Sequence, residues 1–180
     1  MTSMVFTFEI DLAHADRGVY EQLSLRVAQH PSESDEFLIA RVLAYCLEYT
    51  EGIEFSRGLC DADEPPVAVK DLTGALVTWI DVGTPSAERL HRASKAAARV
   101  VVYVHKDPRQ WLPELAATTI HRRDELELYL LERPLVTGLA SRLERRTSCA
   151  LSVTDGEIFV AFPEGNLAGS VSRVATPARR

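Results

Sequence analysis

Apolar and polar residues alternate along the first part of the chain, and this alternation predicts β-structure there. Residues 4–13 and 19–29 place apolar side chains at about every second position, which is the period of a strand with one buried face. Residues 15–18, between them, are of turn-forming types. The pattern therefore predicts two strands joined as a hairpin.

The period of the pattern changes after Pro31, where a helix is predicted. Its apolar residues recur at i, i+3, i+4, i+7 and i+8, which forms one apolar stripe. They are Ile39, Val42, Leu43, Cys46 and Leu47. Ser32 is the expected N-cap, with Asp35 three residues later. Gly52 is expected to end the helix.

Three strands, a helix and a further strand are predicted next. The three strands are residues 53–59, 67–70 and 76–82, the last two joined by a turn at 71–74. An alanine-rich helix at about 86–98, capped by Ser86, leads to an unbroken apolar run at 100–104. Such a run is typical of a strand that is buried on both faces, as in parallel pairing. The order α-β-β-β-α-β predicts a compact mixed α/β unit.

The last part of the chain gives a weaker pattern until its final hairpin. The expected elements are a short helix at 109–117, a strand at 125–131, a helix at 134–146 and a hairpin of strands 148–153 and 158–162. Residues 155–156, Asp-Gly, form the expected hairpin turn. The polar tail, 176–180, is expected to be frayed.

Composition places the chain among globular proteins without a membrane anchor. Hydrophobic residues make up 46% and charged residues 26% of the 180 residues, so a sizeable core is available. No apolar run is long enough for a transmembrane helix, and the N-terminus has no signal-peptide pattern. Three dispersed cysteines favour neither a zinc cluster nor a disulfide framework, so a cytoplasmic location is expected. The net charge of -6 disfavours a general nucleic-acid coat protein.

One acidic residue stands out because it ends an apolar strand. The run at 75–80 is followed by Asp81, within the stretch WIDVG. Metal-dependent nucleases place a magnesium ligand in this way, and they place a lysine two residues later. That position is Gly83 in this chain.

Four stretches together resemble one known family. They are RVAQHPSE (26–33), RGLCDADEP (57–65), DLTGALVTWIDVGTP (71–85) and TDGEIFVAF (154–162). The chain resembles the YaeQ family over nearly its whole length. The resemblance implies a restriction-endonuclease-like core of the PD-(D/E)XK superfamily, with additional strands at both ends, and it implies no particular reaction. One domain over 1–180 is expected, with a core at about 32–105, an N-terminal hairpin at about 4–29 and a β-rich extension at about 120–174.

Nuclease chemistry requires a second carboxylate beside Asp81, because one or two Mg²⁺ ions must be held and must activate water. Asp71 is unsuitable, because it lies in the hairpin turn and Asp81 lies about 20 Å away at the open end of the strand. A two-residue loop would pair Asp81 with Glu64, whereas a three-residue loop with a bulge would pair it with Pro65. Opposite residues have Cβ atoms about 5 Å apart, so Glu64 is the expected partner. Alternatively, Asp63 and Glu64 form a solvated turn.

A third carboxylate is expected from the first predicted helix. Glu36 lies about 50° from the centre of the apolar stripe and Glu33 about 110°. Helical phase therefore favours Glu36, whereas the HPSE motif of the resemblance favours Glu33. Both residues are also explained by helix capping and solubility.

A cation must replace the lysine that is missing at Gly83. The helix at 86–98 offers Lys95, with Arg92 as support, by analogy with superfamily members that carry the lysine on this helix. The other interpretation is a basic solvent face in which Glu88 pairs with Arg92 at i, i+4.

Two hypotheses follow. In the first, the protein is a Mg²⁺- or Mn²⁺-dependent nuclease or phosphodiesterase acting on nucleic acid, with Glu64, Asp81 and the carbonyl of Val82 as metal ligands and Lys95 as the cation. In the second, it is a non-catalytic regulatory protein that binds nucleic acid or protein and retains the nuclease-like fold. The predicted pairing of Glu64 with Asp81 beside a basic helix motivates the first, which is the main prediction, whereas Gly83 and the acidic net charge motivate the second as its alternative. No membrane partner is expected, and the sequence does not specify the oligomeric state.

Overall fold

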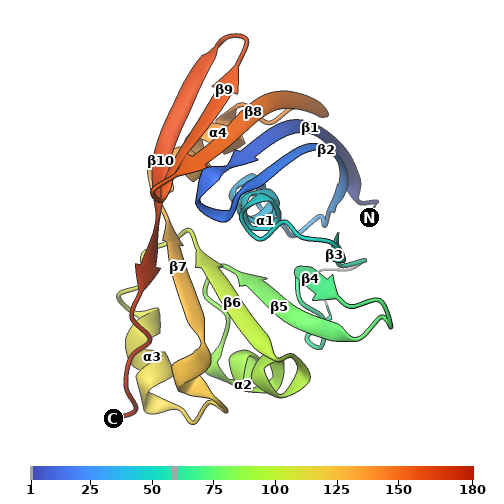
Figure 1. The fold of residues 1–180 in the computed structure, drawn as a ribbon. Helices are drawn as coiled ribbons and strands as arrows, with labels where there is room; N and C mark the ends of the chain where they lie inside the picture. The colour runs from blue at the N-terminus through green and yellow to red at the C-terminus, as the bar shows by residue number, and fades with distance from the viewer. Residues whose placement is uncertain (1, 58–60) are drawn as a thin grey trace. The chain divides into compact units, whose positions relative to one another are not determined.

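The computed structural model describes residues 2–57 and 61–180 as two compact units. The terminal unit comprises Met1–Ile39 and Leu131–Ser172, and the central unit comprises Ala40–Leu130 and Arg173–Arg180. Figure 1 labels the helices and strands of both units. Each unit is mixed α/β, as the sequence predicts. The single domain over 1–180 stays a prediction.

The terminal unit contains five strands in the order β2-β1-β8-β9-β10. Their bounds are Met4–His14 for β1, Val19–Gln29 for β2, Arg146–Thr154 for β8, Glu157–Phe162 for β9 and Gly165–Val174 for β10, whose last two residues belong to the central unit. Strands β1 and β2 pair antiparallel from Met4↔Gln29 to His14↔Val19, and the short helix η1 (Ala15–Arg17) joins them. Strands β8 and β9 also pair antiparallel. Both predicted hairpins are therefore confirmed.

Helix α4 (Arg133–Ser141) packs against β10 in this unit. A Cβ atom at Gly169 would lie 2.6 Å from the Cβ of Leu135, so glycine allows the helix to approach the strand. The prediction that this helix extends to residue 146 is wrong, since β8 begins at Arg146. The sequence analysis missed β10 as a separate strand, because its glycine and polar residues have low β-propensity.

The central unit contains a second set of five strands, in the order β7-β6-β5-β4-β3. Their bounds are Ile53–Phe55 for β3, Val67–Lys70 for β4, Leu76–Val82 for β5, Arg99–Val104 for β6 and Glu127–Leu131 for β7, whose last residue belongs to the terminal unit. Strand β6 pairs parallel with both β5 and β7, and its last five residues are buried, which confirms the interpretation of the apolar run. Residues 58–60, which include the end of the predicted strand 53–59 and Cys60, lie outside the described residues.

The helices are α1 (Asp35–Leu47), α2 (Ala87–Ala96) and α3 (Trp111–Ala117), with the short helix η2 (Arg123–Glu125). Trp79 of β5 and Val102 of β6 pack with Leu90 of α2 in one apolar core. Side chains alternate along a strand, so the neighbours of these residues point to the opposite face. Arg99 and Tyr103 of β6 lie on that opposite face, where both contact Glu48, the residue that follows α1.

The two predicted helix caps have different outcomes. Ser86 caps α2, since its Oγ accepts the backbone N–H of Arg89 at 3.1 Å. The N-cap predicted for α1 is wrong, because the Oγ of Ser34, not Ser32, accepts the backbone N–H of Phe37. Ser32 instead contacts Nδ1 of His30 through its hydroxyl group, within a turn that precedes the helix. All five residues of the predicted apolar stripe are buried.

The C-terminal tail is tied to the central unit. The hydroxyl of Thr176 donates to the carbonyl of Leu126 at 3.1 Å, and Arg123 donates to the carbonyl of Pro177 at 3.1 Å. The expectation that this tail is frayed is therefore wrong, because polar side chains of η2 and of the tail satisfy backbone groups. Along the described part of the chain, none of the helices has the length and apolar composition needed to cross a bilayer.

Candidate functional site

Asp81 lies near the end of β5, as the sequence predicts, but its side chain is buried. Only 3% of the residue is exposed. Strand alternation places its carboxylate on the same face as Trp79, beneath helix α2. A carboxylate at this depth requires hydrogen-bond donors or a countercharge from the protein.

Three protein donors satisfy the carboxylate of Asp81. Oδ2 accepts Nε1–H of Trp79 at 3.0 Å and Nε–H of Arg89 at 2.6 Å, and Oδ1 accepts the backbone N–H of Val82 at 3.1 Å. The guanidinium of Arg89 also lies over the Trp79 ring, 5.1 Å from its centroid. Asp81 and Arg89 thus form a buried, charge-assisted pair enclosed by an aromatic side chain.

Arg89 connects Asp81 to a surface loop. Its Nη1 donates to the carbonyl of Ala62 at 3.1 Å, and its Nη2 donates to the carbonyl of Glu64 at 2.9 Å. Arg89 lies in the first turn of α2, and helical side chains point toward the helix N-terminus. The side chain therefore reaches back from the helix to the end of β5. We call Asp81, Arg89 and Trp79 the Asp81 centre.

The cation beside Asp81 is Arg89, which the sequence analysis did not select. Lys95 is exposed in the last turn of α2. It lies six residues after Arg89, which corresponds to about 9 Å along the helix and about 240° around it. Arg92 is also exposed, and it pairs with Glu88 at 3.9 Å across one turn. That ion pair matches the alternative interpretation of the basic residues as a solvent face.

Gly83 has a backbone conformation that explains the missing lysine. Its φ of 85° lies in the left-handed region, which side chains other than glycine rarely adopt. Its N–H donates to the carbonyl of Tyr103 at 2.9 Å. The chain therefore leaves the strand direction at this residue. Val82, whose carbonyl is a predicted metal ligand, is 4% exposed and pairs with Tyr103 in the ladder.

The predicted pairing of Glu64 with Asp81 is wrong. Val67 lies opposite Ile80, and continuing this register sets Pro66 opposite Asp81. The register shifts between Val69 and Lys70, which moves the pairing beyond both predicted alternatives. Glu64 approaches the Asp81 centre only through its backbone carbonyl, which accepts from Arg89.

Asp71 caps the turn between β4 and β5, in agreement with its exclusion as a metal ligand. Its Oδ1 accepts the N–H and hydroxyl of Thr73 at 2.9 and 2.6 Å and the N–H of Ala75 at 3.0 Å. These hydrogen bonds, the hydroxyl donor of Thr73 foremost, hold the pKa of the Asp71 carboxyl below its ordinary value.

Glu33 and Glu36 belong to the terminal unit, whereas Asp81 belongs to the central unit. One oxygen of Glu33 accepts the backbone N–H of His30 at 3.1 Å in the turn before α1. Glu36 is half-buried in the first turn of that helix, where the helix dipole favours acidic residues. The assignment of either residue as a metal ligand stays a prediction.

The Asp81 centre does not suit a magnesium ion in this arrangement. Mg²⁺ prefers octahedral oxygen ligands and repels cations, whereas the nearest charge to Asp81 is the guanidinium of Arg89. Across residues 2–57 and 61–180, no group of three or more His, Cys, Asp or Glu side chains is placed to hold a metal ion. Metal binding at Asp81 would therefore require Arg89 to leave.

A second buried carboxylate, Glu48, was missed by the sequence analysis. Its Oε2 accepts from Arg99 at 2.6 Å, and its Oε1 accepts the hydroxyl of Tyr103 at 2.6 Å. Arg99 also donates to Glu127 at 2.5 Å, and the ring of Tyr103 stacks on Tyr129. We call Glu48, Arg99, Tyr103 and Glu127 the Glu48 centre.

Burial and charge shift the pKa values in the Glu48 centre. Burial raises the pKa of Tyr103 well above 10.0, and the charge of Glu48 raises it further. Burial alone would lower the pKa of Arg99, but its hydrogen bonds to Glu48 and Glu127 raise it above the ordinary value. The only sequence signal was a glutamate placed one residue after the apolar stripe of the first helix.

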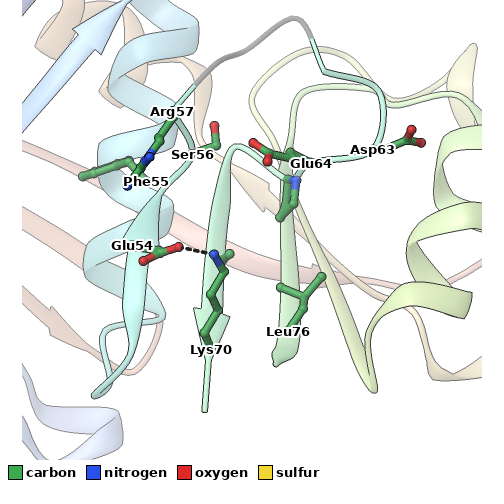
Figure 2. A pocket seen from close by; sticks show the side chains of 10 residues that line it. Glu54, Phe55, Ser56, Arg57, Asp63, Glu64, Lys70 and Leu76 are labelled. Carbon is green, nitrogen blue, oxygen red and sulfur yellow. Dashed lines mark ion pairs between the residues drawn. The ribbon is translucent and has the colours of Figure 1, made fainter. Parts of the chain in front are cut away.

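A cleft of about 450 Å³ opens beside the loop that Arg89 holds. Figure 2 shows its two sides, formed by the segment from Glu54 to Arg57 and by Asp63 and Glu64. Lys70 lies between them and pairs with Glu54 at 2.6 Å. The carboxylate of Glu64 points toward Ser56, whereas Asp63 points away from the centre of the cleft. The predicted interpretation of Asp63 and Glu64 as an exposed turn agrees with their exposure.

The chain is similar to known proteins over most of its length. The family model described as YaeQ protein matches residues 1–170. A YaeQ protein of Escherichia coli (strain K12), described as uncharacterized, is 24% identical over 169 residues, which is 93% of each chain. The crystal structure of YaeQ from Xanthomonas axonopodis pv. citri has a TM-score of 0.88 at 31% identity and covers 98% of this chain and 100% of the other. That of YaeQ from Pseudomonas syringae has a TM-score of 0.87 at 29% identity and covers 97% of both chains. The chain belongs to the YaeQ family.

Proposed function

We propose that this protein is a non-catalytic binding protein built on a restriction-endonuclease-like core of the PD-(D/E)XK type. The order α1-β3-β4-β5-α2-β6 is the order that such a core requires, which supports the fold proposal. In this proposal Asp81, at the end of β5, holds the loop of Ala62 and Glu64 through Arg89 and does not bind a metal ion. A partner then binds without being cleaved.

The observation that carries the proposal is the ion pair between Asp81 and Arg89. Its Oδ2–Nε distance is 2.6 Å, and the side chains are 4% and 20% exposed. A nuclease ligand must present free oxygen lone pairs to a hydrated cation. Asp81 directs its oxygens to Trp79, Val82 and Arg89 instead.

The two remaining contacts of Arg89 support a binding role. A buried ion pair adds little net stability, because removing both charges from water costs about as much as their attraction returns. Such a pair can instead fix a geometry, and here the guanidinium fixes the carbonyls of Ala62 and Glu64. This loop forms one side of the cleft.

The test measures metal binding and nucleic-acid cleavage in one set of variants. Mg²⁺ and Mn²⁺ are titrated by calorimetry, and cleavage is assayed on single- and double-stranded DNA and RNA. Wild-type protein, Asp81→Asn and the control Asp71→Asn should behave alike, with no metal-dependent cleavage. Circular dichroism checks that each variant is folded.

A different result would favour the competing hypothesis of a Mg²⁺- or Mn²⁺-dependent nuclease or phosphodiesterase. Metal-dependent cleavage that folded Asp81→Asn lacks and Asp71→Asn retains would contradict the binding-protein proposal. It would also require Arg89 to leave Asp81 before metal binds. Binding of an oligonucleotide without cleavage would identify nucleic acid as the partner.

A further inference from the structure

The cleft beside the Asp81 centre contains three charged groups that form no ion pair with the described residues. Within the described residues, the side chains of Arg57, Asp63 and Glu64 form no salt bridge. Lys70, by contrast, is neutralised by Glu54. The unpaired charges are therefore one positive and two negative, and they line one cleft of about 450 Å³.

The charges are separated across the cleft. Arg57 lies on the side that continues from β3, and Glu64 lies on the opposite side, in the loop before β4. Ala68 and Leu76 supply apolar surface to the lining of the same cleft. A ligand that fits this pattern carries a cation toward Glu64, an anion toward Arg57 and a narrow backbone between them.

The position of the Glu64 side is fixed from within the protein. Arg89 donates to the carbonyls of Ala62 and Glu64, and Asp81 and Trp79 in turn hold Arg89. Loops are usually the most mobile parts of a fold, so a partly buried arginine that fixes one favours a binding role for it. The support from Arg89 distinguishes the Glu64 side of the cleft from an acidic surface turn that no side chain holds in place.

We infer that the cleft docks an extended peptide segment of a partner protein, with a basic side chain facing Glu64 and an acidic side chain facing Arg57. The inference rests on the proposed function as a binding protein. Charged, open clefts suit peptide side chains better than small apolar ligands, which prefer mostly apolar pockets.

The experiment uses the full chain and a short fluorescein-labelled peptide with one lysine and one glutamate in a glycine–serine background. The spacing of the two charges is varied, and binding is measured by fluorescence anisotropy at low salt. Glu64→Gln and Arg57→Gln should each weaken binding by about 2- to 5-fold, the usual effect of an exposed charge pair. Glu88→Gln is the matched control, since Glu88 is exposed on α2 outside the cleft.

Charge-deleted peptides assign each contact. The peptide whose lysine is replaced by glutamine should bind wild-type and Glu64→Gln equally, because the contact is already absent. The peptide without glutamate should likewise not distinguish wild-type from Arg57→Gln. Added salt should weaken binding of the doubly charged peptide, because both contacts are exposed.

Several outcomes would overturn the inference. They are the absence of saturable binding at every spacing, an equal loss in Glu88→Gln, and tighter binding of an oligouridine probe that Glu64→Gln leaves unchanged. Mg²⁺ binding that Glu64→Gln abolishes would replace the peptide by a metal ion. None of these outcomes depends on the cleavage assay, so this inference and the proposed function can fail separately.

Discussion

The two buried carboxylates of the central unit, Asp81 and Glu48, each accept hydrogen bonds from an arginine and from an aromatic side chain. They differ in the groups to which their arginines donate in addition. Asp81 is held by Arg89 and the indole N–H of Trp79, and Glu48 is held by Arg99 and the hydroxyl of Tyr103. Arg89 donates its other N–H groups to loop carbonyls, whereas Arg99 donates to a second carboxylate. The Asp81 centre is therefore neutral, and the Glu48 centre carries an excess negative charge.

Two similar carboxylate–arginine pairs therefore differ in their exposure and in the groups that their arginines hold. The side chain of Arg89 is 20% exposed and that of Arg99 is 40% exposed, so water reaches the second centre more easily. The neutral centre fixes a surface loop beside a cleft. The charged centre joins β6 and β7 to Glu48, the residue that follows α1. Under the proposed function, binding depends on the first centre, whose arginine holds the loop.

The largest effect is expected from Arg89→Leu. It leaves the carboxylate of Asp81 buried without its countercharge, which should lower the free energy of unfolding by about 3–5 kcal/mol. Urea denaturation measures the loss. Arg92→Leu is the control on the same helix, and it should cost at most about 1 kcal/mol because its ion pair is exposed. A loss as small as that control would show that Asp81 does not depend on Arg89.

A smaller loss is expected from Arg99→Leu, at about 1–3 kcal/mol, because water can hydrate the exposed part of this centre and Tyr103 still donates to Glu48. The same urea experiment gives the value. A loss equal to or larger than that of Arg89→Leu would contradict the ranking of the two centres by exposure. Arg99→Lys, which retains the charge but has no planar fork, should fall between wild-type and Arg99→Leu.

The smallest effect is expected from Tyr103→Phe. Its dependence on pH distinguishes the hydroxyl of Tyr103 from the indole N–H of Trp79. Tyr103→Phe should lower the free energy of unfolding by about 1 kcal/mol near neutral pH, since Glu48 loses one hydrogen bond. Burial raises the pKa of Tyr103 in the folded state above its ordinary 10.0. The stability that protonated Tyr103 supplies is complete below pH 10 and is lost as the pH rises toward the folded-state pKa.

The difference between wild-type and Tyr103→Phe should therefore shrink above about pH 10. Urea midpoints measured across this range test the sign. The indole of Trp79 does not titrate, so Trp79→Phe should show no matching trend relative to wild-type. A constant difference for Tyr103→Phe would mean that the hydroxyl is not held in its protonated form by burial.

The sequence located Asp81 because a strand pattern ends there, and its motifs identified the YaeQ family, to which the chain belongs. It missed the contact with Arg89, because a helical side chain that reaches back past its own N-cap leaves no periodic signal. It missed Glu48 because the partners of that residue, Arg99 and Tyr103, lie far away in the sequence. Such contacts depend on tertiary packing rather than on local pattern.

Strand pairing illustrates the same limit. The bounds of β4 and β5 were predicted correctly from the alternation of side chains. Their register was wrong because one irregularity, between Val69 and Lys70, changes which residues face each other. Because it did not account for this irregularity, the sequence analysis predicted Glu64 opposite Asp81, whereas the structure sets Pro66 opposite Asp81 by continuation of the register.

The left-handed backbone at Gly83 limits the substitutions that this position can accept. Substitution of Gly83 by lysine would place a residue with a Cβ atom at a φ of 85°, with a cost of about 1–2 kcal/mol. The new ammonium group would also meet an aspartate already paired with Arg89. Acquiring the sequence pattern of an active nuclease would therefore require coordinated changes at Gly83 and Arg89 and a different loop, so single mutations are not expected to produce it.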